Sequence, residues 1–297
     1  MGSGLVKVLT AAASFCYGYA QTVTPGGIVN NAGFQAPVAP GSLIAIFGTN
    51  LAATPASAST LPLPTTLGGV TVTVNGNLSV PLIYVSAKQI NAQLPFETPA
   101  GLATLSVSGS APVSFTVAAS APGILTYGNN RAVAINQDGS LNSVDHPAKS
   151  DGWVTVYMSG QGLVNPSVGS GAASPGSPPA IPALPVSATI GKQTAGVMFA
   201  GLTPGAVGLF QVNLRIPVMP SGDFALVVSV GQAHSNAPLI SVSSDGQPVP
   251  SITRTIAYHQ VTNLPDQGPD YRSSFAINGY GTVIALRMTA GRIRSGS

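Results

Sequence analysis

Three histidines are the side chains of this sequence best suited to acid–base chemistry: His146, His234 and His259. Each lies in a segment that we predict to be a loop or a tail. Nucleophilic hydrolysis needs a nucleophile, a base and an orienting acid that converge in space, and no Gly-x-Ser-x-Gly sequence marks a nucleophile. The sequence therefore predicts no catalytic triad.

Acidic residues in the body of the chain occur mainly beside glycine. They form the pairs Asp138-Gly139, Asp151-Gly152, Gly222-Asp223 and Asp245-Gly246. Glycoside hydrolysis requires two carboxylates that face one cleft, whereas an aspartate in such a pair typically stabilises a turn through its side-chain oxygen. We therefore expect turns at these positions, no catalytic residues and no enzymatic activity.

Metal-ligand spacing is absent from the sequence, which contains neither His-x-x-x-His nor a Cys/His cluster. A phosphate-binding Gly-x-x-x-x-Gly-Lys-Ser/Thr sequence is absent too. Residues 136–139 resemble part of a calcium loop, with Asp145 in the position of the closing acid, but Ala134 stands where the first carboxylate ligand belongs. We predict a hairpin turn, with a weak calcium site as the alternative, and no metal-binding or cofactor-binding residues and no cofactor.

Trp153 is the sole tryptophan of the chain and lies in the apolar run GWVTVYM. Because tryptophan buries a large apolar area, we predict that it packs in the core or between domains. A platform that stacks against a ligand is the alternative.

Amides alternate with apolar residues in two related segments, QINAQLP (89–95) and QVNLRIP (211–217). Gln89 and Asn91, like Gln211 and Asn213, therefore share one face of a strand. Such residues most often face solvent or the neighbouring backbone, which is our prediction. A row of exposed amides that binds glycan hydroxyls is the alternative, and the ligand-binding residues are otherwise unknown.

Composition favours an all-β fold. Charged residues make up 6% of the chain, well below the roughly 25% of ordinary globular proteins. The 35 glycines and 26 prolines disfavour long helices, and Val- and Thr-rich runs between them favour strands. Basic and acidic residues balance up to residue 250, and the excess positive charge lies in the arginines of the tail. The body has no basic stripe, so we predict no nucleic-acid partner.

Residues 1–20 resemble a secretory signal. Lys7 supplies the positive charge, residues 8–15 are apolar, and Gly18-Tyr19-Ala20 places small residues at the cleavage site. An uncleaved N-terminal anchor is the alternative. The only cysteine, Cys16, lies inside this leader, so we expect a mature chain without disulfides that is secreted or held at the cell surface.

Two segments of the chain carry the same order of predicted strands and turns. The first has strands at 28–31, 42–47, 69–75, 80–85, 89–95, 102–107 and 113–117. The second has them at 132–136, 152–158, 186–190, 211–217, 224–230 and 237–242. A repeat of this length indicates duplicated domains, and we predict two tandem immunoglobulin-like β-sandwich domains at 21–122 and 123–246. A basic tail, 247–297, would be partly ordered at most, with potential strands at 256–258 and 283–288.

Predicted core residues are the apolar members of these strands. In the first unit they are Leu43, Ile44, Phe47, Val72, Val74, Ile83, Ile90, Leu94 and Leu105. In the second unit they are Trp153, Val156, Ile190, Val212, Leu214, Ile216, Leu226 and Val228.

Five segments together resemble an uncharacterised bacterial domain family that is abundant in Acidobacteria such as Solibacter. They are PGSLIAIFGTNLA, LPLPTTLGGVTVTVNG, YVSAKQINAQLPFE, AINQDGSLNS and FAGLTPGAVGLFQVNLRIP. The resemblance covers residues 27–242. It implies IPT/TIG-like immunoglobulin-like units at the C-terminus of secreted proteins, an extracytoplasmic location and no assigned catalytic residues.

We therefore expect a secreted, non-enzymatic protein that serves in cell-surface adhesion, assembly or scaffolding through protein–protein contacts. Weakly charged β surfaces associate readily, so a protein or cell-envelope partner is expected. The alternative is a carbohydrate-binding accessory module with a polysaccharide partner. A localised function is expected in the loops that differ between the units, 52–64 and 165–185, or in the tail.

Overall fold

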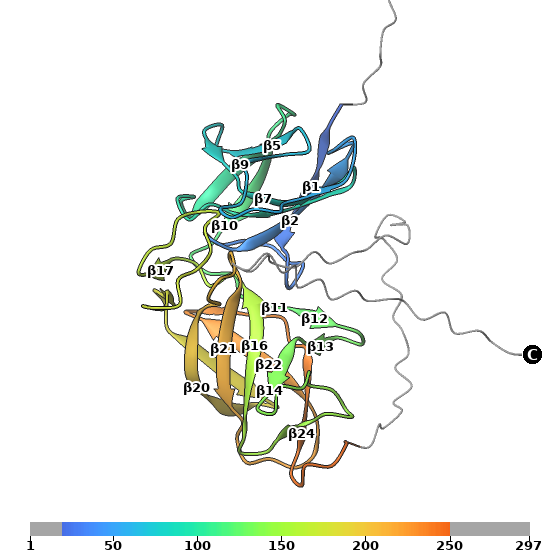
Figure 1. The fold of residues 1–297 in the computed structure, drawn as a ribbon, viewed down its shortest axis with the longest axis vertical. Coiled ribbons are helices and arrows are strands. Elements are labelled where there is room, and N and C mark those ends of the chain that lie inside the picture. The colour runs from blue at the N-terminus through green and yellow to red at the C-terminus, as the bar shows by residue number, and fades with distance from the viewer. Residues whose placement is uncertain (1–19, 250–297) are drawn as a thin grey trace, which may run out of the picture.

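The computed structural model describes residues 20–249. Most of the predicted leader, and the tail from residue 250 with its two predicted strands, lie outside this range. All regular secondary structure within it is β, which confirms the all-β class. No helix in the described range has the length and hydropathy needed to cross a membrane. Figure 1 shows an N-terminal half (residues 22–117) above a C-terminal half (residues 123–243).

Twenty-four strands make up the two halves. Those of the N-terminal half are β1 (Thr22–Asn30), β2 (Leu43–Thr49), β3 (Ala56–Ser57), β4 (Thr66–Leu67), β5 (Val70–Val74), β6 (Leu78–Ser79), β7 (Leu82–Val85), β8 (Gln89–Gln93), β9 (Gly101–Val107) and β10 (Val113–Val117). Those of the C-terminal half are β11 (Gly123–Ile124), β12 (Thr126–Tyr127), β13 (Arg131–Ala132), β14 (Ala134–Asn136), β15 (Ala148–Lys149), β16 (Trp153–Ser159), β17 (Val164–Asn165), β18 (Ile181–Pro182), β19 (Val186–Ile190), β20 (Gln193–Leu202), β21 (Phe210–Arg215), β22 (Gly222–Val230), β23 (Ala233–His234) and β24 (Leu239–Ser243).

Two sheets form the N-terminal half, with strand orders β1-β2-β8-β7-β3 and β10-β9-β5-β4. Strand β5 shows why they pack together, because its valines are buried while the threonines between them are not. A period of two places alternate side chains on one face. The inward residues of both sheets share one apolar cluster that includes Ile44, Val72, Ile90 and Leu105.

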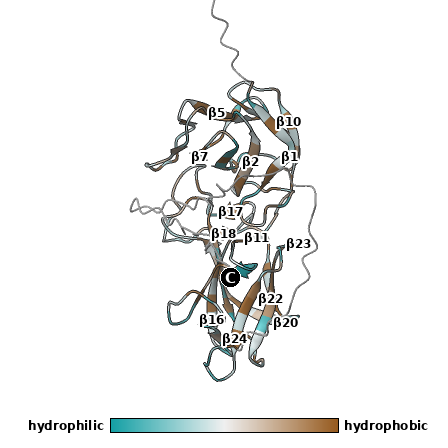
Figure 2. Cartoon of the chain, turned by 90° about the vertical axis from the view of Figure 1, so that its right-hand side faces the viewer, coloured by the Kyte–Doolittle hydropathy of each residue, from teal (hydrophilic) through white to brown (hydrophobic). Residues whose placement is uncertain are grey.

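The C-terminal half has a continuous path of paired strands, β11-β16-β21-β20-β19-β22-β24-β13-β12. The path is continuous because the two ends of β20 pair with different strands. Gly196–Leu202 pairs with β21, and Gln193–Ala195 pairs with β19. A second apolar cluster lies on the inner side of these strands and includes Val156, Phe210 and Leu226. Figure 2 shows apolar and polar residues mixed along single strands, as expected where one side of each strand is buried.

Equivalent strands make equivalent pairings in the two halves. The antiparallel pairs β1–β2, β2–β8, β5–β9 and β9–β10 correspond to β14–β16, β16–β21, β19–β22 and β22–β24. The strand order inferred from the sequence repeat is therefore present in the structure, while the domain boundaries remain predictions. The Asn75-Gly76 turn has φ of 51° and 75°, and the equivalent Gly191-Lys192 has 56° and 73°, as a type I′ hairpin turn requires.

Strand β20 is the largest omission from the predicted elements. It has ten residues, and no strand was predicted between residues 190 and 211. Gly196 and Gly201 weaken the β signal, and a register shift between Val197 and Phe199 breaks the alternation. Smaller corrections are an earlier start for β1, a division of the predicted strand 132–136 at Val133, and a later start for β24.

The predicted core is correct except at two positions. Phe47 and Trp153 are only half-buried. Phe47 lies beside Phe34, with ring centroids 6.4 Å apart. Leu43 and Ile83 are buried, but in a separate cluster with Val207 of the C-terminal half, so these two residues join the halves rather than the two sheets.

Backbone and side-chain hydrogen bonds connect the halves as well. The Leu43 N–H donates to Ser159 Oγ at 2.8 Å, and Asn30 Nδ2 donates to Ser159 O at 3.4 Å and to Ala121 O, in the segment between the halves, at 2.7 Å. Gly171, in the long loop before β18, donates its N–H to Gln93 Oε1 at 2.6 Å. These groups are buried, where an unmade hydrogen bond would cost about 1–3 kcal/mol. The halves therefore meet in a specific, packed joint.

A charged cluster ties β13 to β22 and β24. Both terminal nitrogens of Arg131 donate to the Asp223 carboxylate, at 3.1 Å each, and Ser241 bonds to both partners. Burial alone would raise the pKa of Asp223, but the hydrogen bonds from Arg131 and Ser241 and the positive charge of Arg131 outweigh it and hold that pKa below its usual value.

This cluster predicts an acid-sensitive contribution to stability. The pKa of Asp223 is lower in the folded chain than in the unfolded chain, so its carboxylate stabilises the fold above the unfolded value of about 3.9. That contribution is lost as the pH falls through the folded value. Urea unfolding between neutral pH and pH ~3 should show a smaller loss of unfolding free energy for Asp223→Asn than for the unmodified protein. If both proteins lost the same unfolding free energy over this pH range, the Asp223 carboxylate would not be the group responsible.

Candidate binding surface

The outward side of the sheet formed by β14, β16, β21 and β20 carries the side chains that sequence analysis considered for ligand binding. On β16, Val154, Val156 and Met158 point into the core. Trp153, Thr155 and Tyr157 alternate with them and therefore lie on the opposite side, where each is half-buried.

Strand register arranges this side in three rows. On β21, Gln211, Asn213 and Arg215 point outward because Phe210, Val212 and Leu214 point inward. The residues that face one another across β16, β21 and β20 are Trp153–Arg215–Gly196, Thr155–Asn213–Phe199 and Tyr157–Gln211–Gly201. Ile135 of β14 extends the middle row beyond Thr155. We call these ten residues the aromatic–amide face.

A bulge in β20 places the third aromatic ring on this face. The register shifts between Val197 and Phe199, which makes Met198 an extra residue. Phe199 consequently lies opposite Asn213. A Cβ added at Gly201 would lie 2.6 Å from Phe199 Cζ. The absence of a side chain at Gly201 therefore lets the Phe199 ring lie over Gly201, along β20.

Hydrogen bonds orient the centre of the aromatic–amide face and leave amide groups open. Thr155 Oγ1 donates to Asn213 Oδ1 at 3.0 Å, which leaves the Asn213 NH₂ group directed to other partners. Within residues 20–249, Gln211 makes no side-chain hydrogen bond. Burial raises the pKa of Tyr157, so its phenol keeps its proton at neutral pH and can both donate and accept.

The charge on this face is confined to one end. Arg215 pairs with Asp151 through Nη2 and Oδ1, which are 2.9 Å apart. Both side chains are exposed, so the pair contributes little to stability. It nevertheless leaves no unpaired charge on the face.

The equivalent side of the N-terminal half is closed. Gln89 and Asn91 are the counterparts of Gln211 and Asn213. Gln89 is half-buried, as Gln211 is, but Asn91 and its neighbour Gln93, the counterpart of Arg215, are 0% and 1% exposed. Gln93 bonds to Gly171 and, through Nε2, to Gly41 O at 3.2 Å, while Gln89 donates to Asn91 Oδ1 at 2.7 Å. The first amide row is therefore largely buried in the fold, whereas both amides of the second row are half-buried.

Trp153 occupies neither of its predicted places. It is half-buried rather than in the core. The joint lies at the other end of β16, at Ser159, which bonds to Leu43, so Trp153 does not pack between the halves either. It lies beside Arg215 on the aromatic–amide face, and the alternative of a stacking platform stays a prediction.

The residues considered for the alternative calcium site bond to one another within a turn. Asn136 bonds through its side chain to Ser140, His146 and Asn142, and Asp138 accepts hydrogen bonds from the Ser140 side chain and N–H, which lower the pKa of Asp138. This is the geometry of a hairpin turn. Between residues 20 and 249 no three His, Cys, Asp or Glu side chains are grouped so that they could hold a metal ion.

One serine–histidine contact was not predicted from the sequence. Ser229 Oγ and His234 Nδ1 are 2.7 Å apart across the β22–β23 hairpin. No carboxylate bonds to this histidine in the described part of the chain, and the pair is exposed on a hairpin. A short Gly-containing turn between two strand-forming segments is the signal that could have revealed it. His259 lies outside the described residues.

The two variable loops meet each other at the joint. Leu63 in the first loop donates its N–H to Gly171 O in the second at 2.8 Å, and both Ala58 and Leu63 belong to the apolar cluster that contains Val207. Ser170 of the second loop donates to Glu97 Oε2 at 2.7 Å. Parts of both loops therefore have a structural role.

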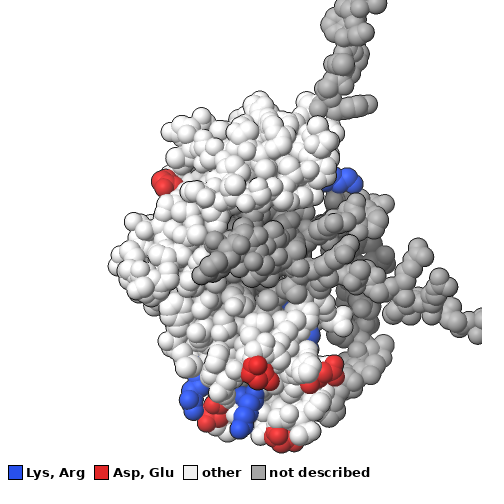
Figure 3. Space-filling model, in the orientation of Figure 1, with Lys and Arg blue, Asp and Glu red and all other residues white. Residues whose placement is uncertain are grey.

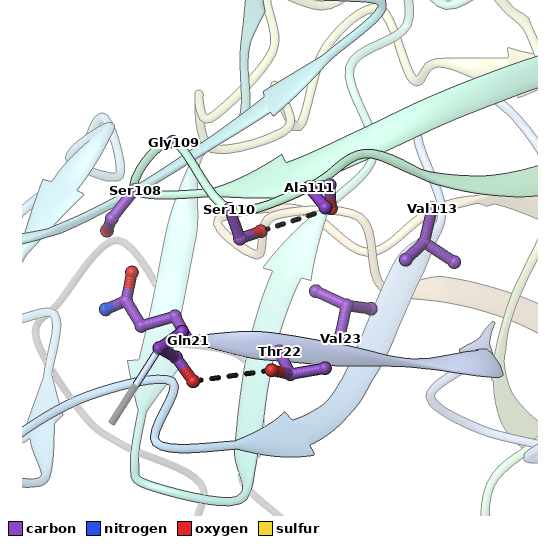
Figure 4. Close-up of a pocket in the computed structure, with 9 residues that line it drawn as sticks. Gln21, Thr22, Val23, Ser108, Gly109, Ser110, Ala111 and Val113 are labelled. Carbon is purple, nitrogen blue, oxygen red and sulfur yellow. Dashed lines mark hydrogen bonds between the residues drawn. The ribbon is translucent and has the colours of Figure 1, made fainter. Parts of the chain in front are cut away.

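A cavity of about 440 Å³ lies at the start of β1, beside the β9–β10 turn. Figure 4 shows Gln21, Thr22 and Ser110 around it. Their polar atoms bond to backbone carbonyls nearby: Gln21 Nε2 to Leu51, Thr22 Oγ1 to Ala20 and Ser110 Oγ to Ala111. The cavity therefore offers fewer free polar groups to a ligand than the aromatic–amide face.

No protein-family model and no curated protein matches the chain. Several solved structures resemble it distantly. SGBP-B of a mixed-linkage glucan utilization locus in Bacteroides ovatus, solved with a heptasaccharide, is 14% identical with a TM-score of 0.30, over 72% of this chain and 43% of its own. Domains 5–6 of the S-layer protein SbsC are 14% identical with a TM-score of 0.25, over 75% and 99%.

The Escherichia coli adhesin FdeC is 13% identical with a TM-score of 0.24, over 70% of this chain and 61% of its own. This chain spans less than half the length of SGBP-B. At these TM-scores the similarities carry no argument about ligand or activity.

Proposed function

We propose that this protein is a non-enzymatic binding protein that acts outside the cytoplasm. It attaches to a component of the cell envelope or its surroundings through the aromatic–amide face, and so serves in adhesion, assembly or scaffolding. The observation that carries this proposal is the face itself, where three aromatic rings and two amides lie on the outer side of one sheet. Tyr157 is partly covered there, because it packs against Ala206 and Leu209.

The surrounding structure makes this face a rigid platform. Val154, Val156, Val212 and Leu214 lie directly beneath it and are fully buried. The side chains above them are therefore held on a packed sheet, which limits the conformational entropy that binding must cost.

The ionisable groups support binding rather than catalysis. Asp151 and Asp223 pair with arginines, and Asp138 and Asp245 accept hydrogen bonds from their own turns. The N-terminal half carries only Lys88 and Glu97 as charged residues. Figure 3 shows that most charged atoms on the visible surface lie toward the lower end of the molecule. A surface with so few charges favours contact with neutral partners.

A charge placed in the middle row tests this function. Thr155→Glu should weaken retention of the full chain on cell envelopes of the source organism by at least about tenfold, because a buried or stacked contact would then have to desolvate a carboxylate. Thr116→Glu, at an exposed position on β10, is the matched control and should retain unmodified binding.

Melting temperatures of both variants must first show that they are folded. Equal retention of the two variants, or no retention of the unmodified protein, would refute binding through the aromatic–amide face.

A further inference from the structure

We propose that the ligand of the aromatic–amide face is a neutral polysaccharide chain. This inference rests on the proposed function and specifies its partner. It follows from three properties of the face: the spacing of the rings, the free groups of the amides and the placement of charge.

Two rings lie on the same strand and one lies across from the residue between them. Trp153 and Tyr157 are four residues apart on β16, which corresponds to about 13 Å along a strand. Phe199 lies in the row between them, two strands away. Aromatic rings offer a flat apolar surface for the C–H-bearing face of a sugar ring, and Tyr and Trp add a polar edge. The separation suits an extended chain of several sugars rather than one monosaccharide.

The amides lie where sugar hydroxyls would need partners. Asn213 is central, with Thr155 on one side and Phe199 on the other, and Gln211 lies between Tyr157 and Gly201. Each amide offers both donors and an acceptor, which matches hydroxyl groups that also do both. The bond from Thr155 to Asn213 Oδ1 fixes the central amide with its NH₂ group available.

The placement of charge and the polar centre of the face distinguish a neutral glycan from other partners. Among residues 20–249, the charges at the face are those of Arg215 and its partner Asp151, which neutralise each other at one end. A nucleic acid requires several unpaired basic residues. A stable protein interface usually buries about 800 Å² per partner around an apolar centre, whereas the centre of this face is occupied by Thr155 and Asn213.

Gly196 adds an open position beside Arg215. A Cβ there would have only Arg215 Cβ nearby, at 3.5 Å. The backbone of β20 is therefore accessible in the row that contains Trp153, and a polysaccharide chain can lie close to the sheet there. Because the equivalent face of the N-terminal half is closed, each protein chain should provide one such site.

The sole tryptophan makes the site directly observable. The full chain should be titrated with neutral polysaccharides (glucans, mannans, galactans and xylans) and with anionic polygalacturonate while Trp153 fluorescence is recorded. At least one neutral polymer should shift the emission with a single class of sites, and its affinity should not fall as salt is raised, since no ion pair forms. Polygalacturonate should produce no such shift.

Matched variants then assign the contacts by affinity electrophoresis in the gel-bound polymer. Asn213→Ala and Tyr157→Ala should each weaken binding by about tenfold, as expected for the loss of one good contact. Trp153→Phe, which keeps a ring, should bind more tightly than Trp153→Ala. Gln89→Ala, in the closed amide row, should bind as the unmodified protein does. Melting temperatures identify any variant that has lost its fold.

Three failures have different meanings. If no neutral polymer binds but Thr155→Glu still abolishes retention on envelopes, the polysaccharide proposal is wrong and the proposed function stands with a protein partner. If polymers bind but Asn213→Ala and Tyr157→Ala bind as tightly as the unmodified protein, the face is not the glycan site. If envelope retention is also insensitive to Thr155→Glu, both proposals fail.

Discussion

Gly160→Ala should lower the free energy of unfolding by about 3 kcal/mol. A Cβ at Gly160 would lie 1.8 Å from Ala121 O, and the residue has φ of +92°. The clash is with backbone, so no side-chain rotation can relieve it. Ala121 also accepts the hydrogen bond from Asn30, and its displacement would disturb the joint between the halves. Urea unfolding at neutral pH measures the effect.

Two further glycine variants separate the cost of the steric clash from the cost of the positive-φ backbone conformation. Gly139 has φ of +85° with no atom within 4 Å of an added Cβ, so Gly139→Ala should cost only about 1 kcal/mol for its backbone conformation. Gly48 is the counterpart of Gly160 in the first repeat, and an added Cβ would lie 2.2 Å from Thr22 O. Gly48→Ala should be nearly as damaging as Gly160→Ala. A loss for Gly160→Ala no larger than for Gly139→Ala would contradict the packed joint.

Phe210→Ala should cost about 4 kcal/mol, the usual loss when a buried aromatic side chain is truncated. Phe210 is fully buried and has the largest volume among the fully buried side chains. It pairs with Met158 on one side and Leu202 on the other, both fully buried. These neighbours belong to strands on either side of β21, so the cavity left by the ring cannot close easily. Chemical denaturation provides the measurement.

Phe210→Leu is the matched control, and it should cost roughly 1 kcal/mol because most of the apolar volume is retained. Both variants should keep the β-type circular dichroism spectrum at low denaturant. A small loss for Phe210→Ala, similar to that of Phe210→Leu, would mean that the C-terminal core collapses around the cavity or is less tightly packed than described.

The strands with clear alternation were predictable from sequence, and those shaped by tertiary contacts were not. Val70–Val74 and its Asn75-Gly76 turn follow from period-two hydrophobicity and from residues that tolerate positive φ. Phe210 was absent from the predicted core because it directly precedes the recognised QVNLRIP segment. Strand β20 was missed because its glycines and its bulge weaken the local β pattern.

The candidate site was only half predictable for a similar reason. The sequence indicates Trp153, Gln211 and Asn213 as candidate ligand-binding residues, but not that they lie together, since Trp153 and Arg215 meet only through the β16–β21 register. It also could not tell the two amide rows apart. Whether a row is open depends on where the joint lies: contacts such as that of Gly171 with Gln93 close the first, and the second remains open.

Strand β20 gives the C-terminal half a continuous path for mechanical load. A ligand held on the aromatic–amide face would pull on β16, β21 and β20, whereas the described chain leaves this half after β24, which pairs with β22. From β21 the paired strands lead through β20 to β19, β22 and β24. Tension between the ligand and the C-terminal end of the described chain is therefore borne by backbone hydrogen bonds in series, and not by the contact of core side chains alone.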